Sequence, residues 1–162
     1  MSVRKWRVPW TIGGLTDFGR VRLSKSFFMR DMLHSEIAEV HGLLNAPDDP
    51  ELAITAGTRL CEELLEPLQD RWGRIAIRSA YRCQAVNQLG CEMQASGKKD
   101  YNCASNAANA AQHIWDLRDQ AGCIGATACV VVPAFWDAHH AEGDWQILAQ
   151  WMHDNLPYTN LH

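Results

Sequence analysis

The feature that most constrains the fold is a strong signal for a long amphipathic helix over residues 46–73, APDDPELAITAGTRLCEELLEPLQDRWG. Asp48 or Asp49 can cap its start, Pro50 suits its first turn, and Gly73 can end it. Apolar side chains recur at helical spacing on one face, at Leu60, Cys61, Leu64, Leu65, Leu68 and Trp72. Such a stripe has to be buried, so the rest of the chain must supply a layer that covers it.

Pro67 interrupts this pattern and predicts a kink or a division of the helix, because proline removes a hydrogen bond and crowds the preceding turn. Two strands are expected after the helix. RIAIRSAY alternates, with Ile75 and Ile77 on one face, which is typical of a half-buried strand. ATACVVVP is short and β-branched and predicts a second, buried strand that Pro133 ends.

The remaining segments give weaker signals. Residues 1–26 are expected to be irregular, and Ser35 and Gly42 can begin and end a short helix. Residues 83–112 are polar and alanine-rich, and we expect them to be partly helical. The stretch GDWQILAQWMHDNL predicts a helix capped by Asp144, with an inner stripe of Trp145, Leu148, Trp151 and Met152.

The last five residues, YTNLH, are similar to the start of a third strand. We therefore expect one domain over residues 27–162 that lacks its last strand or strands.

Charge and hydropathy exclude several classes of partner. The 162 residues carry a formal charge of -4, which makes nucleic acid an unfavourable partner. No window approaches the roughly 20 apolar residues of a membrane span. The N-terminal stretch lacks the apolar core of a secretory signal, so we expect synthesis in the cytoplasm. The six cysteines include no CxxC pair and are expected to be reduced, several of them as small core residues.

A first group of candidate site residues follows the first predicted strand. Ser79, Tyr81 and Arg82 lie at its end, and Asn87 comes five residues after Arg82. A guanidinium beside hydroxyls can hold a carboxylate ligand through two hydrogen bonds. The alternative, which spacing alone favours, is that Arg82 pairs with a local carboxylate and Ser79 caps the next turn.

A second group lies in AQHIWDLRDQAGCIGATAC, residues 111–129. His113, Asp116 and Asp119 supply an imidazole and two carboxylates within seven residues, which are ligand types that bind zinc. Cys129 is a further candidate ligand, although a cysteine in a buried strand is usually core. The alternative is a hydrogen-bonded structural histidine. No GxSxG elbow occurs, and the sequence singles out no cysteine–histidine pair for nucleophilic catalysis.

These elements together resemble a known family. The order LLEPLQDRWG, IAIRSAYR, Asn87, AQH and a small-residue strand is similar, over roughly residues 27–162, to zinc D-alanyl-D-alanine peptidases of the Hedgehog/carboxypeptidase-like fold, including phage endolysins. Those proteins have LEPLR, SGYRS followed by an asparagine, SxHxxGxAxD and a late WxH. The resemblance implies an α+β fold, with a small antiparallel sheet packed against several helices.

Carried over by motif, the resemblance places His113 at the first zinc ligand and Arg82 where it faces the substrate, supported by Ser79 and Asn87. Residue 120 is glutamine, so the second ligand does not transfer. Asp116 and Asp119 are the nearest carboxylates. If GATAC is aligned with GxAxD instead, Cys129 falls at the position of the aspartate.

The third ligand is the larger departure from the family pattern. WMH at 151–153 lies within the last predicted helix, and His162 would be a ligand at the end of the chain. The chain is therefore expected to be either a fragment or a divergent member that has lost its zinc.

The resemblance implies a zinc-dependent peptidase that cleaves bacterial cell-wall stem peptides, with Arg82 holding a substrate carboxylate. Its partners would be peptide or peptidoglycan, and it could be associated with a virion or released at lysis. The alternative is a non-catalytic binding module or a phage structural protein with the same fold. A third possibility is a cytosolic domain whose likeness to the family is coincidental.

Overall fold

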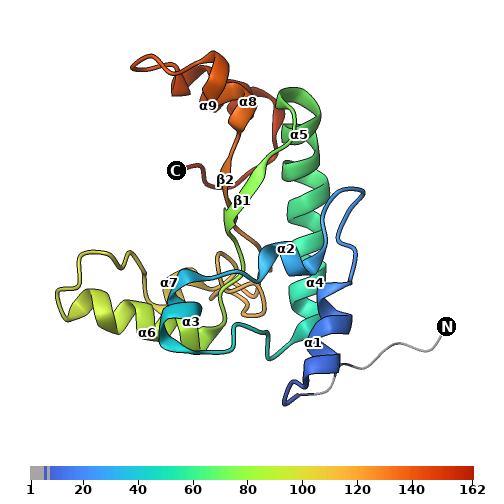
Figure 1. Cartoon of the computed structure of the whole chain (residues 1–162), viewed down its shortest axis with the longest axis vertical. Helices are drawn as coiled ribbons and strands as arrows, with labels where there is room; N and C mark the ends of the chain where they lie inside the picture. Colours follow the sequence, from blue (N-terminus) through green and yellow to red (C-terminus); the bar gives the residue numbers. More distant parts are fainter. Residues whose placement is uncertain (1–5, 7) are drawn as a thin grey trace.

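The computed structural model describes Trp6 and residues 8–162. A long helical column runs along most of the molecule's long axis (Figure 1). It is made of α4 (Pro50–Leu60), a π-helical segment η1 (Cys61–Leu65) and α5 (Glu66–Trp72). The Asp49 side chain accepts the Leu52 N–H and caps its start. Gly73 ends it with φ 85°, in the region that favours glycine. The predicted helix is confirmed at both ends.

Pro67 does not divide the column. The Glu66 N–H instead bonds the Cys61 carbonyl, five residues back, so the hydrogen-bond register widens by one residue directly before Pro67. Pro67 then falls in the first turn of α5, where its missing N–H is tolerated. The expected irregularity is present, and its form is a π segment.

The sheet has two antiparallel strands, β1 (Ala76–Ser79) and β2 (Cys129–Val131). Ala76 pairs with Val131, and Ser79 pairs with Cys129 across an irregularity in the register. The α+β class with a small antiparallel sheet is confirmed.

The expectation of a buried second strand is wrong, because Cys129 is exposed and Val131 is 47% exposed. A two-stranded sheet leaves part of its surface uncovered.

The core lies between the long column, the first helices and the sheet. Trp115, Tyr81 and Phe18 are its largest fully buried side chains. Phe18 belongs to α1 (Ile12–Gly19), whose start is capped when the Thr11 hydroxyl accepts the Gly14 N–H. The expectation that residues 1–26 are irregular is therefore wrong for α1, and residues 1–5 and 7 lie outside the described part. Burial of Phe18 stabilises a helix that the sequence signals weakly.

The helices on one side of the column are α2 (Met29–Met32), α3 (Glu36–His41), α6 (Gln84–Ala95) and α7 (Asn106–Asn109). Ser35 caps α3 by accepting the Ala38 N–H, and Gly42 ends it with φ 64°. Both predicted boundaries are confirmed. The partly helical character expected for residues 83–112 is also confirmed.

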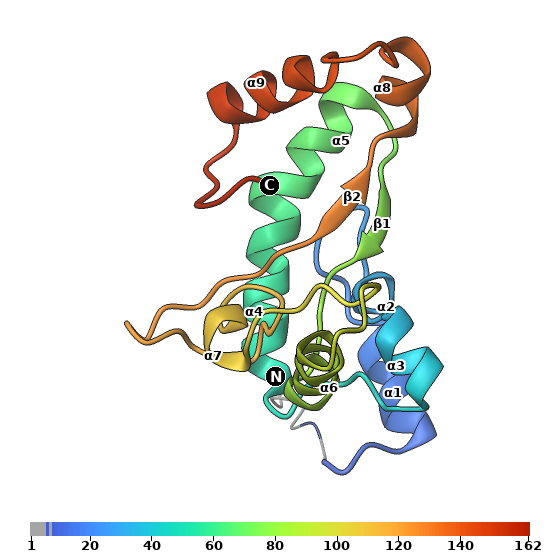
Figure 2. The same cartoon turned by 90° about the vertical axis from the view of Figure 1, so that its left-hand side faces the viewer.

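At the far end of the column lie α8 (Pro133–Ala138) and α9 (Trp145–Asn155) (Figure 2). Leu148, Trp151 and Met152 of α9 pack against the core as expected, whereas Trp145 is 66% exposed and does not.

Residues 158–162 form no strand, so the predicted start of a third strand is wrong. Among the described residues, no helix is both long and apolar enough to cross a bilayer.

Candidate functional site

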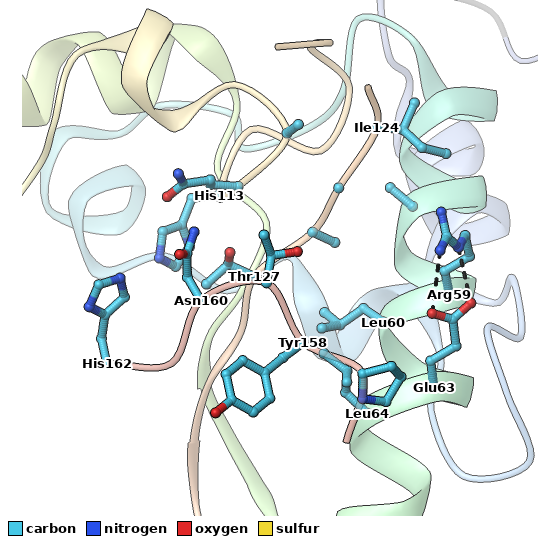
Figure 3. Close-up of a pocket in the computed structure, with 17 residues that line it drawn as sticks. Arg59, Leu60, Glu63, Leu64, His113, Ile124, Thr127, Tyr158, Asn160 and His162 are labelled. Atoms are coloured by element: carbon cyan, nitrogen blue, oxygen red, sulfur yellow. Dashed lines mark hydrogen bonds and ion pairs between the residues drawn. The ribbon is translucent and has the colours of Figure 1, made fainter. Parts of the chain in front are cut away.

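A cavity of about 250 Å³ opens beside the column, between α4 and η1, the segment 124–127 and the last residues of the chain (Figure 3). His113, Asn160 and His162 line one side of it, while Arg59 and Glu63 line the helix side. The cavity therefore gathers residues from four separate stretches of sequence.

His113 is held firmly at the end of β1. Its Nδ1 donates to the Ala80 carbonyl at 2.8 Å, and its own carbonyl accepts the Arg82 N–H at 2.8 Å. Because Nδ1 carries the proton in this bond, Nε2 is left as the acceptor atom of the neutral ring. A backbone carbonyl behind a histidine in this way is the usual support of a metal-binding imidazole.

The Cys129 thiol lies beside this imidazole. Its pKa is lowered from the ordinary range, chiefly by a hydrogen bond with His113 and further by one with Ser79, while partial burial acts in the opposite direction. The antiparallel register explains the meeting, since Ser79 and Cys129 are paired residues of the two strands. The structure thus brings His113, Ser79 and Cys129 together.

The sequence named Cys129 as a further candidate ligand beside His113 but did not single out the two as a pair, because 16 positions separate them in the chain. The signal that pointed to Cys129 is the alternative alignment of GATAC, which puts it at the position of the family's aspartate.

The two aspartates expected to bind a metal with His113 make hydrogen bonds to other groups instead. Asp116 is buried and accepts hydrogen bonds from the Asp48 N–H at 2.8 Å and from the Tyr81 hydroxyl at 3.0 Å. Asp119 is half-buried and accepts the Ala121 and Cys123 N–H groups of its own turn. Among the described residues, no group of three or more Asp, Glu, His or Cys side chains is arranged so that it could hold a metal ion. The structure therefore does not bring His113, Asp116 and Asp119 together.

Tyr81 and Asn87 also lie outside the lining of the cavity. Tyr81 is 1% exposed, and burial raises its pKa far above the ordinary value. Asn87 is fully buried and donates to the Ala104 carbonyl and the Asn106 side chain. Both side chains hold neighbouring segments together, and neither lines the cavity.

Arg82 does not reach the cavity. Its Nη1 donates to Asn87 Oδ1 at 3.1 Å and to Cys103 Sγ at 3.0 Å, which directs the guanidinium toward α6. Neither proposed role, a substrate carboxylate or a local carboxylate, describes these contacts. Ser79 is the one member of the predicted substrate rim that adjoins the His113 and Cys129 side chains.

The two histidines considered for the third ligand lie in different places. His153, in WMH, is exposed on α9, and its Nδ1 is 3.0 Å from the Tyr158 hydroxyl. His162 lines the same cavity as His113 (Figure 3). His162 is the better placed of the two to serve a site centred on His113.

Comparison of the chain with protein-family models, with curated proteins and with solved structures finds no match. The geometry of the site is therefore the basis for assigning its chemistry.

The imidazoles of His113 and His162 line the cavity, and the Cys129 thiol adjoins His113 outside the lining. Imidazole nitrogen and thiolate sulfur are donor types that zinc accepts. His113 offers Nε2, and Cys129 offers a thiol that loses its proton more readily than usual. His162 adds a second imidazole to the lining. Catalytic zinc sites use three protein ligands and keep a fourth position open for water. Among the described residues, no third donor is gathered against His113 and Cys129.

Proposed function

We propose that this protein is a zinc-dependent peptidase similar to the D-alanyl-D-alanine peptidases, with His113 and Cys129 as two of its zinc ligands and His162 as the third. The observation that supports this most is the hydrogen bond between the Cys129 thiol and the His113 imidazole, which lines the cavity. Cys129 replaces the aspartate of the family pattern, in line with the alternative alignment of GATAC.

When bound, zinc would lower the pKa of its water to about 7 and polarise the carbonyl to be cleaved. His113 would be oriented for that role by the Ala80 carbonyl, and Ser79 would support the Cys129 thiolate through its hydroxyl. Leu60 and Leu64 supply an apolar wall suited to small side chains such as alanine.

The substrate class proposed from the resemblance is bacterial stem peptides. A protein made in the cytoplasm would meet them on a virion or after lysis.

Zinc content tests the proposal directly. We expect close to one zinc per chain by elemental analysis, and a fall of at least tenfold in affinity in His113→Ala and in Cys129→Ala, because loss of one of three protein ligands leaves too few to hold the ion. His162→Ala should also weaken binding. His153→Ala is the matched control, since its imidazole lies on the outer side of α9. Full zinc in Cys129→Ala would refute the ligand set.

A separate prediction concerns the aspartates. Asp116→Asn and Asp119→Asn should keep the same zinc content as the wild type, because neither carboxylate is directed at His113. Elemental analysis of the two folded variants checks this. Selective loss of zinc in either variant would restore that aspartate to the site.

The alternative is a non-catalytic peptide-binding module or phage structural protein that keeps the fold. It is favoured by the finding that, in the part of the chain that is described, His113 and Cys129 lack a third ligand gathered against them. Peptide binding without zinc uptake or hydrolysis would support this alternative.

A further inference from the structure

We infer that Arg59 on α4 is the carboxylate anchor of the cavity, the role that the family resemblance assigns to Arg82. The inference deepens the proposed function, because it concerns the peptide that the same cavity would take. It can be tested without zinc.

The Arg59 guanidinium is placed to meet a carboxylate that enters the cavity. Among the described residues that line the cavity, Arg59 is the only arginine or lysine, and Figure 3 shows it on the helix side, facing the space between α4 and the end of the chain. The Arg82 guanidinium is tied to Asn87 and Cys103 instead. A carboxylate that enters the cavity therefore meets Arg59.

Arg59 already holds a carboxylate, that of Glu63, in the geometry that a ligand carboxylate needs. Its Nε lies 3.0 Å from Glu63 Oε1 and its Nη2 lies 3.4 Å from Glu63 Oε2. Two donors thus face two oxygens of one carboxylate, the arrangement in which arginine binds carboxylates most specifically.

The ion pair between Arg59 and Glu63 is easily exchanged for one with a ligand. The Arg59 and Glu63 side chains are 59% and 44% exposed, and pairs of this kind contribute little to stability. A peptide carboxylate can take the place of Glu63 at small cost, and Glu63 can swing into solvent. Glu63 then acts as a competitor that weakens binding of the ligand.

The cavity wall next to Arg59 defines the rest of the ligand. Leu60 and Leu64 line the cavity together with Ala126, so small apolar side chains can pack beside the bound carboxylate. The ligand class is therefore a short peptide with a free carboxylate and small side chains.

The experiment compares N-acetyl-D-alanyl-D-alanine with its C-terminal amide, by calorimetry or chemical-shift titration, on metal-free and zinc-loaded protein. The metal-free protein should prefer the acid roughly threefold to tenfold, which is the range for an exposed charged hydrogen-bond pair. Arg59→Gln should abolish the preference, whereas Glu63→Gln should strengthen binding of the acid several-fold and leave the amide unchanged.

Arg82→Gln is the matched control, and it should retain the preference. A preference that survives in Arg59→Gln, or that disappears in Arg82→Gln alone, would overturn the inference, as would equal binding of acid and amide by metal-free wild type. An Arg59-dependent preference in a protein that takes up no zinc would leave the anchor standing and refute the peptidase. Zinc uptake without a preference for the acid over the amide would refute the Arg59 anchor and leave the proposed zinc site standing.

Discussion

Gly57→Ala is expected to destabilise the protein by about 1–3 kcal/mol, although alanine is the better helix former. Gly57 lies in α4, and a Cβ there would come 2.6 Å from Trp115 Cζ3 and 3.3 Å from Leu23 Cδ1. Trp115 cannot yield easily, since it is fully buried and its ring packs edge-on against Tyr81. Chemical unfolding of the variant measures the loss.

The effect should extend to the site. The Trp115 Nε1 donates to the Thr127 carbonyl at 3.3 Å, two residues before Cys129. A displaced ring would move this segment, so Gly57→Ala should also bind zinc more weakly under the proposed function.

Gly13→Ala is the control, because Gly13 lies in α1 with nothing within 4 Å of an added Cβ. It should stabilise the protein by roughly 0.5 kcal/mol through helix propensity alone. A gain in stability in Gly57→Ala as well would show that Trp115 does not occupy this position.

Asp116→Ala is expected to cost about 2–5 kcal/mol, because it removes the buried acceptor of three hydrogen bonds and leaves the buried Tyr81 hydroxyl without a partner. The donors are the N–H groups of Asp48 and Asp49, at 2.8 and 3.4 Å, and the Tyr81 hydroxyl at 3.0 Å. The Asp48 and Asp49 contacts fasten the start of the long column. Tyr81→Phe removes one donor and should cost less, about 1 kcal/mol. Urea unfolding at constant pH compares the two.

The same carboxyl group should make stability depend on pH. Burial raises the Asp116 pKa above its ordinary value of 3.8, against hydrogen bonds that lower it. The native state therefore binds this proton more tightly than the unfolded state. The contribution is complete below about pH 3.8 and is lost as pH rises through the raised pKa of the native state.

Asp116→Asn removes the titratable carboxyl group and therefore its contribution to the pH dependence of stability. The difference in unfolding free energy between wild type and Asp116→Asn should therefore fall as pH rises from about 3.8 and then level off. A difference that grows with pH would mean that the backbone hydrogen bonds outweigh burial.

Local signals in the sequence predicted the elements that local physics stabilises. The column over residues 50–72 has a cap, an apolar stripe and a terminal glycine within its own sequence, and the short helix of Glu36–His41 has Ser35 and Gly42 at its ends. Alternation predicted β1 equally well. Each of these depends on contacts a few residues apart.

Helix α1 was missed because its stability comes from Phe18, which packs against Trp6 and Trp10 outside the helix. The exposure of β2 was missed because a run of valines predicts a buried strand, and the sequence does not show that the sheet has only two strands in the described residues. In both cases the deciding contact, or its absence, lies outside the segment.

The sequence by itself determined the long column and the two strands and identified His113 as a residue of interest, and its resemblance to the peptidase family implied the α+β class. Only the tertiary structure decided which side chains meet: Cys129 and Ser79 at His113, Asp116 with Tyr81 in the interior, and Arg59 instead of Arg82 on the cavity wall. The physical reason is distance along the chain. Caps and stripes are satisfied by neighbours in the sequence, whereas a site is formed by the packing of segments that lie far apart in it.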